Sequence, residues 1–148
     1  MSVFARSFPF VICLLSTAVP HVGVLACALP RSIEERISEG YARETISAAV
    51  LVRVTRARYT GPARGDAHPW SAASKVERVL RGRLAPSELV FKGGWGSAAC
   101  QPPAHLPNGG DLWVLYLWEP EKGRQVTWLA LPAAQARAAD GSISRMLG

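Results

Sequence analysis

The chain has 148 residues, a length typical of a single domain. Hydrophobic residues make up 49% of it, and Lys and Arg outnumber Asp and Glu by 17 to 11, which gives a net charge of +6. Glutamates are interspersed among the arginines of the first half, so no solid basic block of the kind that marks a nucleic-acid tail is present in the sequence. The pattern is typical of a solvated surface, with attraction to anionic lipid or polysaccharide as the alternative.

The first 26 residues differ from the rest of the chain. Arg6 is their only charged residue, and the stretch FPFVICLLSTAVPHVGVLA at 8–26 is almost wholly apolar. A short charged region, an apolar region and small residues before a cleavage site are the pattern of a secretory signal peptide. A transmembrane helix is the alternative, which the prolines of this stretch disfavour. We predict a signal peptide at 1–26 and one domain at 27–148 of a secreted or periplasmic protein, whose net charge falls to about +5 when Arg6 is removed.

Cysteine usage follows from that prediction. Cys13 lies in the predicted signal peptide, which leaves Cys27 and Cys100 in the mature chain. Two cysteines in an exported protein suggest one disulfide. In the chain-entropy model, closing a loop of roughly 73 residues would stabilise the fold by about 4 kcal/mol. Two unpaired, buried thiols are the alternative.

The cleavage site decides whether such a bridge can form. Cleavage after Ala26 makes Cys27 the first mature residue, whereas cleavage after Ala28 removes Cys27 and leaves Cys100 alone. An unpaired thiol in an oxidising compartment is unfavourable, which favours the first site. The sequence VLAC at 24–27 also partly matches a lipoprotein signal, in which a diacylglyceryl group is attached to the Cys27 sulfur. A lipidated Cys27 could not pair with Cys100, so the two fates exclude each other.

The mature chain begins with a helix signal. Ser32 and Glu35 have the spacing of a capping box, in which each side chain bonds a free backbone N–H group of the other residue. Ile33, Ile37 and Tyr41 follow at helical spacing. We predict a short helix over about 33–41.

The period then changes to two, which is typical of a strand. Val50, Val52 and Val54 alternate with Leu, Arg and Thr, so one face of this first strand is expected to be buried. Arg56 and Arg58 would fall on the valine side if the alternation continued. That position indicates either a β-bulge or an open barrel mouth.

Four further strands are predicted, at 71–80, 88–92, 111–118 and 125–131, separated by loops rich in Gly and Pro. The stretch DLWVLYLW is apolar on both faces, which predicts a central, doubly covered strand. The stretch PAAQARAA could form a terminal helix that ends at Asp140-Gly141. Together these elements predict a mainly β fold: a five-stranded OB-like Greek-key barrel with a short N-terminal helix and a possible C-terminal helix, or, alternatively, a small sandwich.

Five short stretches resemble a known family when they are read in order: CALP at the mature start, AAVLVRV, SKVERVLRG, GSAAC and NGGDLWVLYL. Their order and spacing are similar to those of the netrin-like superfamily, in particular the tissue-inhibitor-of-metalloproteinases type and its secreted bacterial relatives, over about 27–131. The resemblance implies an OB barrel and a disulfide between Cys27 and Cys100.

The resemblance also implies a way of acting. In those inhibitors the α-amino group and carbonyl of the first Cys chelate the zinc of the protease, a role that would fall here on Cys27. An α-amine with a pKa near 8 is easily deprotonated to bind zinc. Ala28 and the 97–100 segment would form the rest of a contact ridge, whose loop residues are Ser97, Ala98 and Ala99. This chain departs from the family pattern at Leu29, where a second Cys is usual, and it lacks the other disulfides.

Tryptophans and histidines give the remaining candidates. Trp113 and Trp128 lie in predicted strands and are expected in the core. Trp70 and Trp95 lie at loop edges, where an exposed ring could anchor a partner. Cys100 and His105 are too few for a zinc site or a catalytic pair.

The predicted function is therefore that of a non-catalytic binding module with an unknown protein partner. In the most specific version of this prediction, the partner is a zinc metalloprotease. No cofactor, no metal of its own and no nucleic-acid partner are expected. The alternative is an envelope lipoprotein with a structural role, anchored through Cys27, the only case in which we expect membrane contact. An enzyme ranks third, because no carboxylate pair, nucleophile triad or phosphate loop is visible in the sequence.

Overall fold

The computed structural model describes residues 32–83, 86–96, 105–118 and 126–148. The predicted signal peptide, its cleavage site and the cysteines lie outside these ranges. The helices are α1 (Ile33–Ala42), α2 (Ala133–Ala139) and α3 (Gly141–Leu147). The strands are β1 (Ala48–Tyr59), β2 (Trp70–Arg81), β3 (Glu88–Gly93), β4 (Leu112–Trp118) and β5 (Val126–Pro132).

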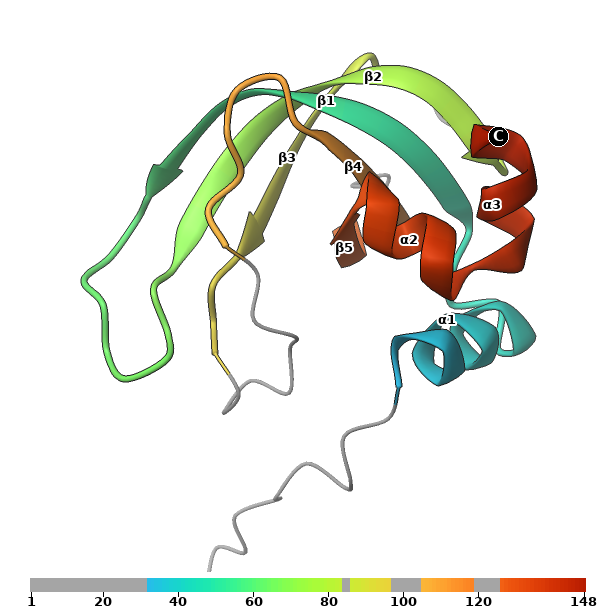
Figure 1. Cartoon of the computed structure of the whole chain (residues 1–148), viewed down its shortest axis with the longest axis horizontal. Helices are drawn as coiled ribbons and strands as arrows, with labels where there is room; N and C mark the ends of the chain where they lie inside the picture. Colours follow the sequence, from blue (N-terminus) through green and yellow to red (C-terminus); the bar gives the residue numbers. More distant parts are fainter. Residues whose placement is uncertain (1–31, 84–85, 97–104, 119–125) are drawn as a thin grey trace, which may run out of the picture.

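The five strands form one open antiparallel sheet with the strand order β3-β2-β1-β4-β5. β1 lies at its centre and pairs with β2 on one side and β4 on the other. Figure 1 shows that β1 and β2 are long and bent into an arch. The prediction of a mainly β fold is confirmed, and each predicted strand agrees with an observed one to within a residue or two.

The predicted helices are present, and one further helix was not predicted. α1 begins with the capping box: Glu35 N donates to Ser32 Oγ and Ser32 N donates to a Glu35 carboxylate oxygen, both at 3.1 Å. α2 ends at Asp140 as expected, but the chain then forms α3 instead of stopping. The reason is that the Asp140 side chain accepts from the backbone N–H groups of Ser142 and Ile143 and so caps a new helix.

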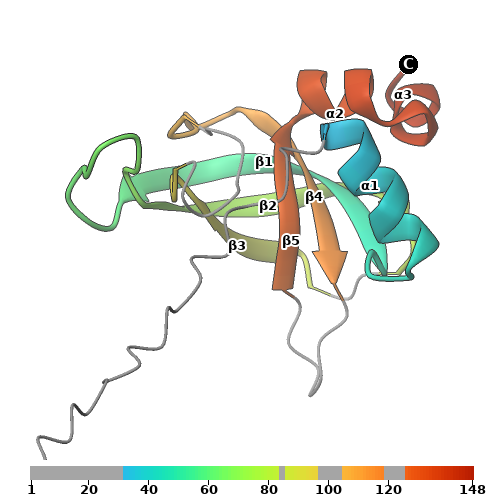
Figure 2. The same cartoon turned by 90° about the horizontal axis from the view of Figure 1, so that it is seen from below.

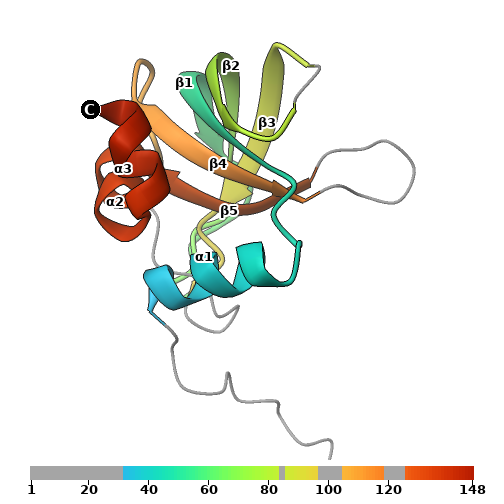
Figure 3. The ribbon, with the colours of Figure 1, turned by 90° about the vertical axis from the view of Figure 1, so that its right-hand side faces the viewer.

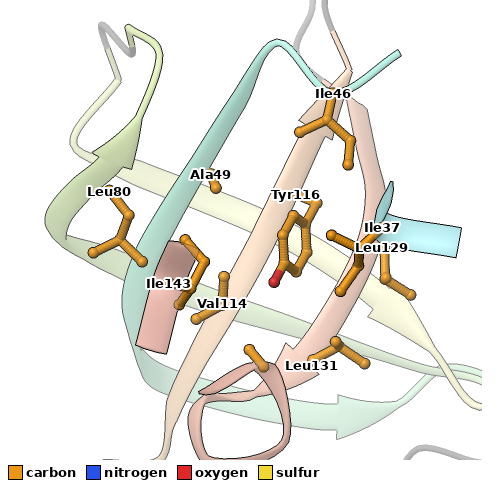
Figure 4. Packing of buried hydrophobic residues seen from close by; sticks show 10 residues of the cluster. Ile37, Ile46, Ala49, Leu80, Val114, Tyr116, Leu129, Leu131 and Ile143 are labelled. Carbon is orange, nitrogen blue, oxygen red and sulfur yellow. The ribbon is translucent and has the colours of Figure 1, made fainter. Parts of the chain in front are cut away.

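The sheet buries both of its faces at its centre, which creates two hydrophobic cores. The inner core lies on the concave face, and its ten buried members include Val50, Val52, Val54, Trp70, Phe91 and Trp113. The helix-side core lies on the opposite face, where β4 and β5 meet the helices (Figure 4). β4 serves both cores, because Trp113 and Leu115 point to one and Val114 and Tyr116 to the other. The prediction of a doubly covered strand at 111–118 is therefore confirmed.

A β-bulge determines which face of the sheet Arg56 and Arg58 occupy, the two arginines that interrupt the alternation of β1. Val54 pairs with Ser74 and Arg56 with the next residue, Ala73, so Thr55 is the extra residue. The Thr55 hydroxyl donates to the carbonyl of Ala73 at 3.0 Å. The extra residue reverses the alternation, so that Arg56 becomes exposed instead of lying on the valine side. The bulge alternative of the sequence prediction is the correct one.

The helices lie on one side of the sheet. Figures 2 and 3 show α1, α2 and α3 grouped beside β4 and β5. α3 also contacts the C-terminal end of β2, where the Arg78 guanidinium donates to the carbonyl of Met146. α1 packs there through Ile37 and Gly40, and Arg36 lies 5.9 Å from the ring centre of the half-buried Trp128. Trp113 is buried as predicted, whereas Trp128 is only partly buried because it lies at the edge of the helix-side core.

Candidate functional site

Two of the predicted partner-contact residues, Trp95 and Trp70, lie in the described part of the chain. Cys27, Ala28, Ser97, Ala98, Ala99 and Cys100 lie outside it, and their pairing and contacts stay predictions. Trp95 and the residues around it form a surface at one end of the sheet.

Trp95 follows β3, and its segment lies against the long loop between β1 and β2. The backbone N–H of His68 donates to the carbonyl of Gly94 at 2.7 Å, which extends the β2–β3 pairing beyond Gly93. The Trp95 side chain is 42% exposed, which agrees with the expected exposure of its ring. A large exposed ring on a segment held by the sheet is a feature of partner-binding surfaces.

The 60–69 loop beside Trp95 is itself ordered by short-range bonds. Thr60 N donates to Pro69 O at 2.8 Å, and Arg64 and Ala67 exchange backbone hydrogen bonds of 2.7 and 3.0 Å. Tyr59 and His68 stack across the base of the loop, with ring centres 3.5 Å apart and planes within 5° of parallel. The Tyr59 side chain is 49% exposed, so a second aromatic surface lies at this end of the sheet.

The glycines on either side of Trp95 allow this close approach. Gly94 and Gly96 have φ values of 76° and 75°, a backbone conformation that residues with a side chain rarely adopt. A Cβ atom on Gly94 would lie 2.1 Å from the His68 carbonyl oxygen, and one on Gly96 would lie 2.7 Å from an Asp66 carboxylate oxygen. We call the loop 60–69, the segment 94–96 and the rings of Tyr59, His68 and Trp95 the loop-end surface.

Trp70 does not belong to this surface, and the prediction that its ring is exposed is wrong. Its side chain is 1% exposed and lies in the inner core, in edge-to-face contact with Phe91 and Trp113 at centroid distances of 5.7 and 5.9 Å. Trp70 is the first residue of β2 and has the same inward orientation as Ala72. Its strand partner is Gly93, which leaves room for the indole: a Cβ there would lie 2.4 Å from Trp70 Cζ2.

Sequence reasoning missed a polar cluster around Asp140. The Asp140 carboxylate is 5% exposed and accepts hydrogen bonds from the hydroxyls of Tyr41 at 3.0 Å and Tyr116 at 3.3 Å. Its other oxygen accepts from the Ser142 backbone N–H at 2.9 Å and hydroxyl at 2.6 Å. The available sequence signal was an N-cap Asp followed by Ile143 and Leu147 at helical spacing. The link to Tyr41 spans 99 residues, and no local pattern predicts it.

The pKa values of this cluster follow from its contacts. Burial raises the pKa of Asp140, but the hydrogen bonds from Ser142, Ile143 and Tyr41 outweigh it and hold the pKa below the ordinary 3.8. Burial and the neighbouring Asp140 charge raise the pKa of Tyr41 to about 12. The same two causes raise the pKa of Tyr116. The cluster therefore contains a carboxylate and two neutral phenols at neutral pH and joins α1, β4 and α3.

A shallow groove of about 550 Å³ lies between the segment before β4 and the start of α2. Its titratable side chains are Asp111 and the exposed His105, and Asp111 accepts a 2.7 Å hydrogen bond from the backbone N–H of Asn108. Within the described ranges, His, Cys, Asp and Glu do not gather in a group of three that could hold a metal ion. No helix of the described part is long and apolar enough to cross a membrane.

Comparison with known proteins adds no family to these observations. No protein-family model, no curated protein and no solved structure matches the chain.

Proposed function

We propose that this chain is a secreted or periplasmic, non-catalytic binding module of the tissue-inhibitor-of-metalloproteinases-like type, and that a protein partner docks on its loop-end surface. The observation that carries the proposal is the exposed ring of Trp95. Its segment is held against the 60–69 loop by the backbone hydrogen bond from His68 to Gly94 and by the positive φ angles of Gly94 and Gly96. A rigid aromatic anchor loses little conformational entropy when a partner binds it.

The proposal includes the finer fold. β3 and β5, the two edges of the sheet, contact each other, which supports a sheet curled into a nearly closed, OB-type Greek-key barrel. In such barrels, the loops at one end form the binding surface. Trp95 precedes Cys100 by five residues, so a bridge from Cys100 to Cys27 would bring the mature N-terminus near the loop-end surface.

The most specific form of the proposal is inhibition of a zinc metalloprotease through the α-amino group and carbonyl of Cys27. The test uses the exported, processed protein against thermolysin and a matrix-metalloprotease catalytic domain, with the α-amine free and then acetylated. We expect inhibition by the free form and its loss on acetylation, because an acylated nitrogen cannot chelate zinc. Equal inhibition by both forms would rule out chelation, and no inhibition by either would rule out the protease as the partner.

Two matched tryptophan variants test the contact surface in the same assay. Trp95→Ala should weaken inhibition by about thirtyfold, the loss of roughly 2 kcal/mol that is usual for an aromatic anchor. Trp118→Ala is the control, because Trp118 is 49% exposed but lies at the end of β4. If both variants inhibit like the wild type, the loop-end surface is not the contact.

The intact mass of the exported protein separates this proposal from the lipoprotein alternative. A mass two hydrogens below that of the reduced chain from 27 to 148 indicates the bridge. A gain of lipid mass indicates an anchor at Cys27, and the binding-module proposal then loses its free N-terminus.

A further inference from the structure

A second surface of the molecule, distinct from the loop-end surface, has the charge and shape of a binding site. It lies on the outer face of β1, β2 and β3, the face opposite the inner core. Because the helices group beside β4 and β5, they leave this part of the arch uncovered (Figures 1 and 3). We define the outer basic face as Arg56, Arg58 and Lys92 together with Ser71, Ala73 and Val90, which lie between or beside them.

Strand register places these residues in two rows across the sheet. In one row Arg58 pairs with Ser71, which pairs with Lys92. In the next row Arg56 pairs with Ala73, which pairs with Val90. Neighbouring strands lie about 4.8 Å apart and alternate residues of a strand about 6.6 Å apart, so the backbone positions of the three cations lie roughly 7 to 12 Å from one another. Ser71 and Ala73 are small and leave the space between the cations open.

The three cations are not neutralised within the described part of the chain. The side chains of Arg56, Arg58 and Lys92 are exposed and form no ion pair or hydrogen bond with any described residue. One row further along, Arg53 differs, because its Nε donates to a Glu77 carboxylate oxygen at 2.8 Å. Like charges held this close on a rigid sheet repel one another, and an anionic ligand relieves that repulsion.

The bulge at Thr55 produces this surface. Without the extra residue in the alternation, Arg56 and Arg58 would point to the inner face with Val54. With it, Ala57 points inward opposite Ala72 and both arginines point outward in phase with Lys92. The bulge thus brings the positive charges of Arg56, Arg58 and Lys92 together on the outer face of the sheet.

The character of the face selects among anionic partners. Stacking of single-stranded nucleic acid needs aromatic rings, and the outer basic face contains none. A lipid bilayer needs apolar groups to insert, and Val90, 66% exposed, is the one large apolar side chain of the face. The arch is convex toward solvent, so a flat bilayer would touch only its crest, whereas a linear polymer can follow the rows of cations. Arginine also matches the planar carboxylates and the tetrahedral oxyanions of such a polymer through paired hydrogen bonds.

We propose that the outer basic face, through Arg56, Arg58 and Lys92, binds a linear anionic polysaccharide. This site is separate from the proposed protein contact at Trp95. The assay measures binding of the full exported protein to immobilised heparin, which carries sulfates, and to alginate, which carries uronates, at low and physiological salt. Binding to at least one of the two is expected, with an affinity that falls as salt screens the charges.

Matched triple variants decide whether the face or the net charge is responsible. Arg56→Gln/Arg58→Gln/Lys92→Gln should lose at least tenfold in affinity. Arg43→Gln/Arg137→Gln/Arg145→Gln removes the same charge from exposed positions in or next to the helices and should change affinity less than twofold. Thermal unfolding of both triple variants checks that each is folded. If a triple variant does not fold, the three single substitutions are measured instead, and each should lose less affinity than the triple variant.

Three outcomes would overturn the proposal. The first is equal loss in both triple variants, which would mean that only net charge matters. The second is wild-type affinity in the Arg56/Arg58/Lys92 variant. The third is that neither polysaccharide binds, or that a poly-dT oligonucleotide or phosphatidylglycerol vesicles bind more tightly than both. Loss of polysaccharide binding with wild-type behaviour in the protease assay would separate this site from the loop-end surface.

Discussion

Asp140 is the residue that joins the most distant parts of the chain. It accepts hydrogen bonds from α1 through Tyr41, from β4 through Tyr116 and from the first turn of α3. Asp140→Ala should lower the free energy of unfolding by about 2 to 4 kcal/mol, because α3 loses its cap and two phenols are left without acceptors. Tyr116→Phe should cost about 1 kcal/mol. Urea unfolding measures both, with Tyr59→Phe as an exposed control. Wild-type stability of Asp140→Ala would contradict the assignment.

The same carboxylate predicts a dependence of stability on pH. Its pKa is below 3.8 in the folded protein, so the unfolded chain takes up the proton first as the pH falls. Its contribution to stability is complete well above pH 3.8 and is lost as the pH falls through the folded-state pKa. We expect wild type to be more stable than Asp140→Asn at pH 7 and the difference to shrink below about pH 4. Unfolding in urea at pH 7, 5, 4 and 3 measures it, and a constant difference would count against an ionised Asp140.

Two tryptophans show what sequence can and cannot say at the residue scale. Trp70 and Trp95 both adjoin Gly- and Pro-rich loops, and both were expected to be exposed. Trp95 is exposed, but Trp70 is buried because its cross-strand partner is a glycine that makes room for the ring. Strand register is a non-local property, so the sequence around Trp70 does not contain this information.

At the scale of elements, periodicity was informative where one face is buried. The valines of β1 and the unbroken apolar run of β4 predicted strands whose bounds and burial the structure confirms. The capping box predicted the start of α1 for a local chemical reason. α3 was not predicted, because the sequence Asp140-Gly141 is typical of the end of a helix. Asp is equally common as an N-cap, which is its role here. The loop-end surface was found only in part, since its Tyr59–His68 stack depends on how the loop closes.

The bulge in β1 gives a prediction at this scale. Deleting Thr55 removes the extra residue but leaves Arg56 and Arg58 outward, so the loss should be about 1 kcal/mol, the value of the hydroxyl bond to Ala73. Deleting Ala57 instead turns one of the two arginines toward the inner core, and burial of an unpaired charge should cost several kcal/mol. Urea unfolding of the two deletion variants compares them. Equal losses would mean that the bulge does not set the phase of the strand.

At the scale of the whole molecule, the sheet uses its two faces differently along its length. Its inner face is buried over most of the arch. Its outer face is covered by the helices at β4, at β5 and at the end of β2 that carries Leu80, and it is open where Arg56, Arg58 and Lys92 lie. The open part carries the outer basic face, and the end of the arch carries the loop-end surface. Sequence predicted the five strands but not this division, because which strands the terminal helices cover depends on tertiary contacts such as that of Ile143 with the helix-side core.

The predicted bridge between Cys27 and Cys100 concerns the whole molecule, because it would close a loop containing β1, β2 and β3. If it forms, the serine substitutions of Cys27 and Cys100 remove the same constraint on the unfolded chain. Each single variant and the double variant of the exported protein should then lose the same stability, about 4 kcal/mol, measured by urea unfolding without reductant. Two separate buried thiols would instead give single losses that add in the double variant. A Cys27 that is cleaved off or lipidated would leave Cys27→Ser and Cys100→Ser with unequal effects, because no shared bond would connect them.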